Sequence, residues 1–550
     1  MKRQPDLLSD GVFDLIVIGG GIQGACIAMD AAVRGLRVAL LEKGDFGCAT
    51  SHNSLKLLHG GLRYLQHFDL PRIRQSITER RYWLSAAPHL CRPLAFLMPL
   101  RGLGTRSRAA LLAAMKLYDL VSLGRNSGVR PECRIPPGYT VSRETLYELA
   151  PGLRPGYTSG AIWYDGQMLE ADRLLLACVV AASEAGAVVL NYAEVLGLRQ
   201  QRDHRVTGVN VCDRMTGREF EVRGSHTALA AGPWNPMFLR RAGIGRAQAT
   251  VSQIKNMNVV VPRLFAHDAL AVGIESRRRS DSTVGNTNRL FFVTPWKDWS
   301  IIGTTHEPFD AEPETCSFDD HDVEEFLGEF NEAYTRSVLR REDVLYVYGG
   351  LTPGEGGEGQ PRRSRHGTVT DHERIDGVKG LWTVTSVKYT TARWLAERAV
   401  DAIVDRVMSK PCPCTLLGKP LPGGEHYAGR EAVVNSLVGA TGLEPAQLLD
   451  FAMAYGSRAE QVLDRGGFER GSGVDGLLRC RLAYSIREEM AVSAGDLLYR
   501  RTSLGVTGGD APGLRSEIES LLERELGRRD VPGRYSDLAT GASKAVGVSR

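Results

Sequence analysis

Short apolar runs and helical periodicity alternate at the start of this chain. An apolar run at residues 15–18 leads into a glycine-rich turn, an alanine-rich helical pattern follows, and a second apolar run at 38–41 ends at Glu42. Apolar runs of this length, separated by a helix, are typical of buried parallel strands. The pattern predicts a strand–helix–strand unit in a parallel sheet.

Further helices and strands follow, each marked by its own periodicity. Residues 71–92 carry a helical pattern that Pro88 closes, because proline cannot continue a helix. Helical periodicity returns at 171–187. Strand patterns and one alternating hairpin pattern occupy 188–192, 206–224 and 227–235.

The pattern of apolar and polar residues changes in the middle of the chain. β-branched and aromatic residues alternate through 250–309, which predicts a separate antiparallel sheet that covers or floors a substrate. Residues 317–340 and 388–407 return to helical periodicity. A segment rich in proline and glycine from 411 marks a linker, and residues 428–526 beyond it are predicted to be helical.

Composition describes a globular protein. At 550 residues the chain is long enough for two or three domains. Hydrophobic residues make up 43% and charged residues 24%, a balance typical of a soluble protein rather than a disordered or membrane-spanning one. The net charge of +4 is close to neutral for this length, whereas nucleic-acid binding usually shows as a concentrated basic face. We therefore expect no nucleic-acid partner.

The cysteines suggest a reducing compartment. Ten are scattered without a CxxC pair or the histidine spacing of a zinc site, so we expect no metal site and a cytoplasmic protein. The N-terminal sequence lacks the apolar core of a signal peptide, and no apolar run approaches the ~18 residues of a membrane-spanning helix. Any membrane contact is expected to be peripheral, on the inner face of the cytoplasmic membrane. The sequence is compatible with an oligomer as well as with a monomer.

The glycines of the first turn have the spacing Gly19-x-Gly21-x-x-Gly24. In a dinucleotide-binding unit the first permits a tight turn, the second lets backbone approach a pyrophosphate, and the third lets the helix pack closely on the strand. The helix N-terminus then faces the phosphates with unpaired N–H groups and a positive dipole end. Glu42 lies where an acid is expected to bind a ribose hydroxyl, so this stretch predicts a bound dinucleotide.

A segment dense in hydrogen-bond donors follows Glu42 directly. It is too rich in glycine, serine and threonine for a regular helix, and loops next to a binding motif often carry function. An ordinary polar loop is the alternative. Candidate ligands of a phosphate or a flavin edge are the side chains of Thr50, Ser51, Ser54 and Lys56 and the backbone of Gly60 and Gly61.

Leucines and basic residues mix through residues 101–123. The mixture is compatible with a basic amphipathic helix lying on a membrane surface. Such a helix more often packs on the protein core, and both interpretations stay open.

Motifs in every part of the chain match one known family. They are GGGIQGACIAMDAAVRGL, CATSHNSLKLLHGGLRYL, AAGPW, PWKDWSIIGTT, SRHGTVTDH, KYTTAR, YGSRAE and YSIREEMAVSAGDLLYRRTSLG. Together they resemble the FAD-dependent, aerobic type of glycerol-3-phosphate dehydrogenase. The combination of LKLLHGGLRYL with REEM and RRTSLG is far more specific than the glycine spacing.

The resemblance implies an α/β fold. An FAD-binding, Rossmann-like domain of the glycine or amino-acid oxidase type would be followed by an antiparallel-sheet substrate or cap domain and a C-terminal all-α domain. In that order the domains would comprise residues 12–100 with 150–245 and 340–408, residues 101–149 with 246–339, and residues 425–528. The two ends of the chain, residues 1–11 and 531–550, are expected to be flexible tails.

FAD is the cofactor that the resemblance implies. Its expected ligands come from the glycine turn, the end of the second strand, the donor-rich segment and two later motifs. They are Gly19, Gly21, Ile22, Gln23, Gly24, Glu42, Lys43, Thr50, Ser51, Ser54, Lys56, Leu57, His59, Gly232, Lys388, Tyr389 and Thr390.

The family's reaction oxidises a secondary alcohol to a ketone, with glycerol 3-phosphate and dihydroxyacetone phosphate as the implied substrate and product. A base takes the hydroxyl proton, the carbon hydride passes to flavin N5, and a quinone or oxygen reoxidises the flavin. A phosphate needs fixed cations, and arginine suits it because it binds bidentately. By motif, Arg63, Arg365 and Lys388 match the family's basic substrate-site positions.

Three positions depart from the family's substrate-site pattern. Asn258 stands where the family has a histidine, Thr352 stands where it has an arginine, and Ser386 with Val387 replaces two glycines. Losing one cation of a phosphate clamp costs on the order of 1.5 to 3 kcal/mol, about ten- to a hundredfold in binding. Asn258 and Thr352 stay candidate substrate contacts.

Asparagine cannot act as a base near neutral pH, so another group must accept the proton. The candidates are His366, His306, His59 and a deprotonated Lys388, and for each histidine a purely structural role is an equal alternative. The expected catalytic set comprises Arg63, Arg365, Lys388 and His366.

Two other functions stay open. The departures gather at substrate-facing motifs while the FAD motifs are intact, as retargeting to a different alcohol, amine or phosphorylated metabolite would produce. A non-catalytic, FAD-bound scaffold is the other alternative, because Asn258 and Thr352 allow it.

Overall fold

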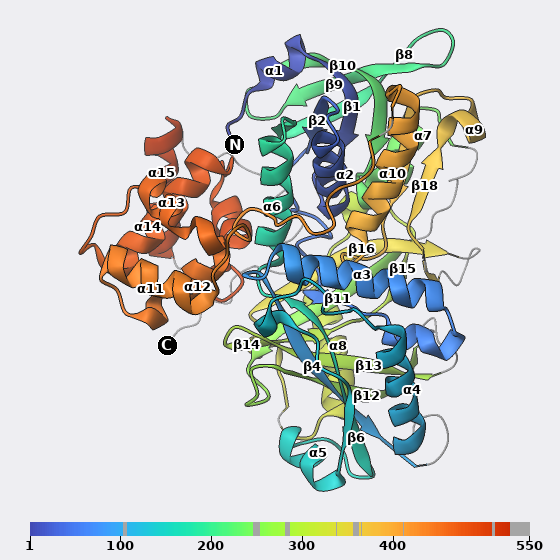
Figure 1. The fold of residues 1–550 in the computed structure, drawn as a ribbon, viewed down its shortest axis with the longest axis vertical. Helices are drawn as coiled ribbons and strands as arrows, with labels where there is room; N and C mark the ends of the chain where they lie inside the picture. The colour runs from blue at the N-terminus through green and yellow to red at the C-terminus, as the bar shows by residue number, and fades with distance from the viewer. Residues whose placement is uncertain are drawn as a thin grey trace.

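The computed structural model describes residues 1–527, apart from 103–106, 246–252, 281–286, 337, 356–361, 365, 411 and 509–511. Arg365 and the expected tail at 531–550 lie outside the described residues, and for Arg63 only the backbone is described. The structure has two large sheets and a C-terminal group of helices (Figure 1).

The first sheet has a mainly parallel centre. Its strands, in spatial order, are β18 (Thr368–Asp371), β19 (Leu381–Thr385), β10 (Glu219–Leu229), β1 (Val12–Ile18), β2 (Val38–Leu41) and β7 (Val188–Leu190). β1 pairs in parallel with both β10 and β2, and α2 (Ile22–Val33) connects β1 to β2. The predicted strand–helix–strand unit is thereby confirmed. α2 shares one apolar core with α6 (Ala171–Glu184) and α10 (Ala392–Val407), and Figure 1 shows the three helices side by side.

Two strand patterns that the sequence separates form a single strand. The second half of the predicted hairpin and the first residues of the strand pattern at 227–235 are both part of β10, which ends at Leu229. The first half of β10 pairs with β9 (Val206–Asp213), which also pairs with β8 (Ala193–Gln200), and its second half pairs with β1. The burial pattern changes from alternating to continuous along β10 because the strand passes from the sheet edge to its centre.

The second sheet is mainly antiparallel, which confirms the sheet predicted for 250–309. Its strands, in spatial order, are β17 (Arg362–Arg363), β16 (Tyr346–Glu355), β11 (Gln253–Pro262), β14 (Trp299–Gly303), β13 (Thr287–Trp296), β12 (Leu270–Ser280), β4 (Cys91–Leu100), β6 (Ser159–Met168) and β3 (Leu57–Leu58). β15 (Glu307–Phe309) lies beside β11, and β5 (Tyr139–Val141) lies beside β6.

β3, β4, β6 and β16 lie within the ranges expected for the FAD-binding domain, yet they pair in the second sheet. The expected domain ranges therefore do not coincide with the membership of the two sheets. Periodicity identifies a segment as a strand but does not specify its partner, since the same alternation suits either sheet. The chain therefore passes repeatedly between the sheets, and both contribute residues to the space between them.

Helices cover the sheets. The predicted helices at 71–92 and 317–340 are confirmed as α3 (Leu70–Ala86) and α8 (Asp320–Ala333), and α8 packs on the second sheet. The stretch at 101–123 contains the shorter helix α4 (Arg108–Val121), whose buried residues are Met115 and Tyr118. The remaining helices of these parts are α5 (Arg143–Leu149), α7 (Asn235–Arg241) and α9 (His372–Asp376).

The N-terminal residues, which we expected to be a flexible tail, are packed. α1 (Pro5–Asp10) buries Leu8 completely, and Arg3 donates to Oδ1 of Asn191 (2.8 Å) and Asp213 (2.6 Å). Six residues are too few for a stable isolated helix, so these tertiary contacts hold it in place.

The predicted C-terminal helical region is confirmed. Its helices appear orange to red in Figure 1, beside α6, and apolar side chains of α14 and of a π-helical turn pack against β11, β14 and β16 of the second sheet. The elements are α11 (Arg430–Thr441), α12 (Pro445–Tyr455), α13 (Ala459–Gly466), α14 (Gly473–Glu488), the π-helical turn η7 (Asp496–Arg501) and α15 (Pro512–Leu526).

Candidate active site

The turn between β1 and α2 requires glycine. Gly19 has φ +105°, and a Cβ there would lie 2.7 Å from the carbonyl oxygen of Ala230. A Cβ at Gly24 would lie 1.8 Å from the carbonyl oxygen of Gly19, so only glycine lets α2 pack this closely. Gly21 caps α2 without a side chain and lines a cavity. The N-terminus of α2 thereby directs backbone N–H groups towards that cavity.

Glu42 lies at the end of β2, beside this turn. Its carboxylate accepts hydrogen bonds from the backbone N–H groups of Gly20 (2.6 Å) and Gly44 (2.8 Å). Burial raises the pKa of Glu42, and the two N–H groups oppose that rise. The backbone thus holds an acid at the cavity wall in the place where a dinucleotide-binding unit binds a ribose.

A cavity of about 500 Å³ extends from the glycine turn to the second sheet. It brings together most of the residues that the sequence indicated. Those in its wall are Gly19, Gly21, Ile22, Gln23, Glu42, Lys43, Thr50, Ser51, Ser54, Leu57, His59, Gly232, Asn258, Thr352, Lys388, Tyr389 and Thr390. Gly24, Lys56 and His366 do not line it, and the side chains of Arg63 and Arg365 lie outside the description.

Lys56 is buried away from the cavity wall. Its Nζ lies 3.9 Å from Oδ2 of Asp172 and 4.5 Å from the ring centre of Tyr348. Burial lowers the pKa of Lys56, and the carboxylate of Asp172 opposes that change. Lys56 has φ +57°, so the backbone reverses locally and directs the side chain into the interior. The contact expected between Lys56 and the cofactor stays a prediction that this orientation does not favour.

Polar side chains of the second sheet form one wall of the cavity. Thr304 donates from Oγ1 to Oδ1 of Asn258 (2.6 Å), and Nδ2 of Asn256 donates to Oγ1 of Thr352 (2.9 Å). Nδ1 of His306 hydrogen-bonds to Oδ1 of Asn256 (2.6 Å). Within the described part of the chain, no protein group pairs with Nδ2 of Asn258. Both substituted positions therefore belong to one neutral, hydrogen-bonded wall.

Lys388 adds a cation to the cavity wall between β19 and α10. Its Nζ lies 4.3 Å from the ring centre of Tyr64, in the distance range of a cation–π contact. Ser386 and Val387, which replace two glycines of the family pattern, also line the cavity. Their side chains take up space where a flavin or a substrate would otherwise meet backbone.

His59 is the histidine of the candidate set that lines the cavity. Its Nδ1 lies 3.7 Å from Oδ2 of Asp165, whose other oxygen accepts from the N–H of Gly60 (2.6 Å). Burial alone would raise the pKa of Asp165, but the interaction with His59 and the charge of Arg80 outweigh it and hold that pKa below its ordinary value. Asp165 is therefore ionised and places a negative charge beside the imidazole.

His366 and His306 lie elsewhere. His366 is exposed, in the loop before β18, and its side chain does not reach the cavity wall. The catalytic role expected for His366 stays a prediction that this position does not favour. The SRHG motif marks a loop by sequence alone, and the way that loop turns depends on its tertiary contacts. His306 hydrogen-bonds to Asn256 and thereby supports the neutral wall.

Three residues of the site were not predicted from the sequence. Asp165 and Asn256 gain their roles from the partners that strand pairing places beside them, so no local signal marks them. Glu314 reaches the cavity from beyond the second sheet, accepts from Nε1 of Trp234 (2.5 Å) and lies 3.5 Å from Nζ of Lys43. The AAGPW motif points to Trp234, whereas Glu314 stands in an ordinary polar segment.

Comparison with known proteins agrees with this geometry. A family model described as FAD dependent oxidoreductase matches residues 14–402, and one described as the C-terminal domain of alpha-glycerophosphate oxidase matches residues 414–530. The glycerol-3-phosphate dehydrogenase of Synechocystis sp. is 30% identical over 526 residues, 93% of this chain and 92% of that protein. The chain belongs to the glycerol-3-phosphate dehydrogenase family of FAD-dependent oxidoreductases.

Other family members differ in the substrate that their names carry. The D-erythritol 1-phosphate dehydrogenase of Brucella abortus is 31% identical over 497 residues, 89% of this chain and 94% of that protein. Among solved structures, the glycerol-3-phosphate dehydrogenase from Bacillus halodurans complexed with FAD superposes with a TM-score of 0.71 at 23% identity, covering 97% of this chain and 96% of that one. At 23% identity, this structural similarity shows the fold alone.

As a family member the protein is an oxidoreductase with FAD as its cofactor. The described residues fit this group. The glycine turn would accommodate the pyrophosphate at the N-terminus of α2, where a Cβ at Gly19 or Gly24 would collide with backbone. Glu42 would hold a ribose hydroxyl, and the cavity continues from there to the neutral wall and Lys388.

Proposed function

We propose that this enzyme oxidises a hydroxyl-bearing carbon of a small phosphorylated polyol, with glycerol 3-phosphate as the first candidate. The observation that carries the proposal is the cavity that joins the glycine turn to Lys388 and the neutral wall. When bound, FAD accepts the hydride of the alcohol carbon. The names of two relatives, which act on glycerol 3-phosphate and D-erythritol 1-phosphate, support a phosphorylated polyol.

Cations and amide donors would bind the substrate together. Lys388, with Arg63 and Arg365 by motif, would neutralise the phosphate, since a dianion in a cavity needs fixed positive charge. Nδ2 of Asn258 and the hydroxyl of Thr352 face the same cavity and can donate to substrate oxygens. Thr352 supplies a hydrogen bond where the family pattern has a charge.

His59 would take the hydroxyl proton. It lines the cavity, and the carboxylate of Asp165 beside Nδ1 favours the tautomer whose Nε2 carries the lone pair. Arg80 and the N–H of Gly60 hold that carboxylate in place. His59 combines a cavity position with a carboxylate neighbour, and this combination favours it as the base.

A longer polyol phosphate is the second candidate. The neutral wall of Asn256, Asn258, Thr304 and Thr352 offers amides and hydroxyls, which bind additional hydroxyl groups better than they bind a phosphate. A four-carbon phosphate would use this wall for hydroxyls that glycerol 3-phosphate lacks. The two candidates therefore differ in the number of hydroxyls rather than in the chemistry of the step.

Anaerobic flavin reduction tests the proposal. The purified protein is expected to be yellow, and glycerol 3-phosphate or D-erythritol 1-phosphate should bleach it without oxygen. Glycerol and erythritol should bleach it at least about tenfold more slowly at equal concentration, because each lacks the phosphate that the cations bind. The phosphate that bleaches the flavin faster identifies the chain length of the preferred substrate. Bleaching by neither phosphate, or equally by the unphosphorylated polyols, would rule out the proposed substrate class.

We also propose a cytoplasmic enzyme that reaches a membrane through α4, with a quinone as electron acceptor and oxygen as the alternative. All ten cysteines are free thiols, as a reducing compartment would leave them. Within the described residues, no helix is long and apolar enough to span a bilayer. Support for membrane contact comes from the leucines that α4 and its C-terminal turn expose.

A further inference from the structure

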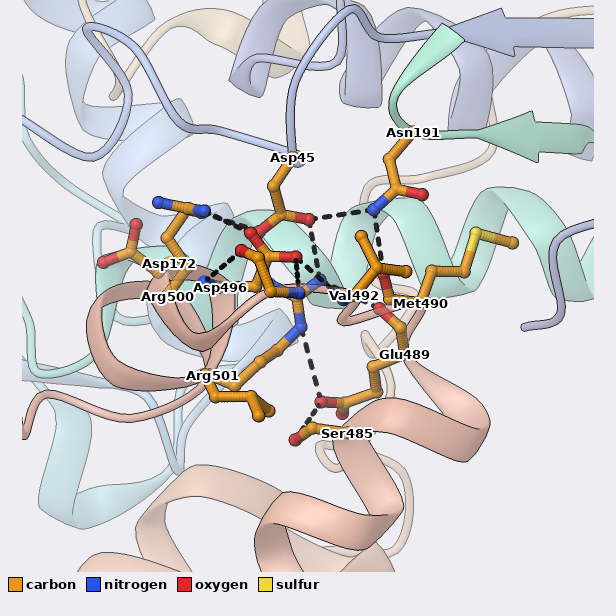
Figure 2. Close-up of polar contacts among 12 residues, drawn as sticks. Asp45, Asp172, Asn191, Ser485, Glu489, Met490, Val492, Asp496, Arg500 and Arg501 are labelled. Atoms are coloured by element: carbon orange, nitrogen blue, oxygen red, sulfur yellow. Dashed lines mark hydrogen bonds and ion pairs between the residues drawn. The ribbon is translucent and has the colours of Figure 1, made fainter. Parts of the chain in front are cut away.

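A buried cluster of charges joins the C-terminal helices to the segment that follows Glu42 (Figure 2). The carboxylate of Asp45 is fully buried and accepts from Nε of Arg500 (2.6 Å) and from Nη1 (2.7 Å) and Nη2 (2.9 Å) of Arg501. Both arginines belong to the π-helical turn η7, about 455 residues further along the chain. Asp45 is thus held by a part of the protein that does not line the cavity.

The cluster is balanced in charge. Arg500 also donates to Asp496 (2.5 Å), Nε of Arg501 lies 3.8 Å from Glu489, and Arg173 of α6 donates to Glu489 (2.7 Å). Three carboxylates therefore face three guanidinium groups, and no side chain of the six is more than 10% exposed. In such an interior each charge depends on its partners, so the positions of Asp45 and η7 are fixed relative to one another.

A second connection runs through Asn191 and Tyr192. Nδ2 of Asn191 donates to Oδ1 of Asp45 (3.1 Å) and to the carbonyl of Met490 (2.9 Å), and the hydroxyl of Tyr192 donates to Asp496 (2.7 Å). Figure 2 shows Asn191 between Asp45 and Met490. The C-terminal part therefore holds the end of β7 as well as the segment after β2.

These two segments enclose Glu42. Its N–H donates to the carbonyl of Leu190 (3.0 Å), its carbonyl accepts from Ala193 (2.7 Å), and Tyr192 donates to the carbonyl of Gly44 (2.8 Å). Gly44 in turn donates to the Glu42 carboxylate (2.8 Å). A shift of Asp45 or Tyr192 would therefore reach that carboxylate through one or two hydrogen bonds.

The segment after Asp45 returns to the glycine turn. The N–H of Gly47 donates to the carbonyl of Gly20 (3.0 Å), and Oγ of Ser51 accepts from the N–H of Ile22 at the start of α2 (3.0 Å). On the other side of Asp45 along the chain, the Glu42 carboxylate accepts from the N–H of Gly20 (2.6 Å), so contacts with the dinucleotide motif flank Asp45.

We propose that Arg500 and Arg501 of the C-terminal helices are positioning residues for the cofactor: by holding Asp45 they set the conformation of residues 42–51 and so place Glu42 and Ser51 for FAD. The C-terminal part would then complete the FAD site without touching it. The inference concerns the cofactor and is independent of the proposed substrate.

The affinity of the apoprotein for FAD tests this inference. Asp45→Asn keeps the size of the side chain but removes its charge, and the dissociation constant for FAD, followed by quenching of flavin fluorescence, should rise roughly tenfold or more. Arg173→Gln is the matched control, because it removes a buried charge from the same interface without contact to residues 42–51. It should lower thermal stability comparably and change the FAD dissociation constant by less than about threefold.

A second, milder pair of variants tests the inference if the Asp45→Asn protein does not fold. Arg501→Lys retains the charge but loses the bidentate hydrogen bonds to Asp45, and it should weaken FAD binding more than Arg173→Lys does. Equal effects of the Arg501 and Arg173 variants, or an unchanged dissociation constant in Arg501→Lys, would overturn the inference. Because no alcohol is present in the measurement, the result does not depend on which substrate the enzyme oxidises.

Discussion

Asn258 and Thr352 carry neutral side chains where the family pattern has ionisable ones, and their contacts explain how the site can tolerate this. Each belongs to a hydrogen-bonded pair, with Thr304 and Asn256 respectively, so the wall needs no counter-ion. In the proposed function, positive charge for a phosphate would come from Lys388 and, by motif, from two arginines. Proton transfer would likewise be separate from this wall, with His59 as the proposed base.

Replacement of His59 tests that assignment. His59→Asn keeps a polar side chain but removes the basic nitrogen, and the rate of flavin reduction at saturating substrate should fall about a hundredfold or more. FAD binding, measured by flavin absorbance, should stay within a few-fold. Stopped-flow reduction under anaerobic conditions gives the rate.

His366→Asn is the matched variant, because it makes the same exchange on an exposed loop. Its rate of flavin reduction should equal that of the unaltered enzyme. If the His366 variant loses the rate and the His59 variant keeps it, the assignment of the base is wrong.

At the scale of elements, α4 stands apart from the other helices of the FAD-binding and substrate parts. It buries two residues, while Leu112, Leu117, Leu120 and Leu123 along it and just after it are exposed, Leu123 to 79%. One face of α4 packs on the core through Met115 and Tyr118, with Leu111, Ala114 and Val121 partly buried beside them. The exposed leucines lie outside that face, and exposed leucines next to basic residues are the pattern of a helix that lies in a membrane interface.

Liposome binding tests α4. The protein should cosediment with anionic vesicles at low salt, and the double change Leu120→Glu with Leu123→Glu should reduce the bound fraction at least about tenfold, because both apolar and electrostatic terms are lost. Leu417→Glu changes an exposed leucine of the linker and should leave binding unaltered. Absence of binding by the unaltered protein at low salt would exclude the membrane contact.

At the scale of the whole molecule, the junction between the C-terminal part and the rest contains a second buried titratable group. His89 is 2% exposed and lies against Gly423 and Gly456 of the C-terminal part, where a Cβ would approach its ring to 2.7–2.8 Å. Nδ1 has no hydrogen-bond partner in the described structure. Burial, followed by the charges of Arg173 and Arg458, lowers the pKa of His89 to about 3.

The unfolding free energy should therefore depend on His89 below neutral pH. The unfolded chain binds a proton at this histidine below its ordinary pKa of 6.5, whereas the folded protein does so only near pH 3, so stability present above pH 6.5 is lost as the pH falls. Between pH 7 and 5 the loss is roughly 2 kcal/mol. Urea unfolding at the two pH values should show a smaller loss in His89→Gln.

His204→Asn serves as the control for this pH dependence. His204 is exposed in the β8–β9 turn with φ +59°, which asparagine tolerates, so the variant should lose as much stability as the unaltered protein. The comparison is between variants because burial also lowers the pKa of His52, which contributes with the same sign. Equal losses in both variants would show that His89 does not titrate in this way.

Local rules were enough to determine the dinucleotide unit, the order of most helices and strands, and, by resemblance, the family and cofactor. The demands of a tight turn at Gly19 and of close packing at Gly24 act within a few residues, so the sequence displays them directly. The same holds for the helical periodicity of the C-terminal part.

Tertiary structure alone decided which sheet β4 and β6 join, that Lys56 turns into the interior, and that Asp45 meets Arg500 and Arg501. None of these has a local signal, because strand partners and buried ion pairs are selected by packing and charge compensation between segments up to about 455 residues apart. The FAD motif can therefore be recognised in the sequence. The contacts from the C-terminal part that we propose to support it form only when the chain folds.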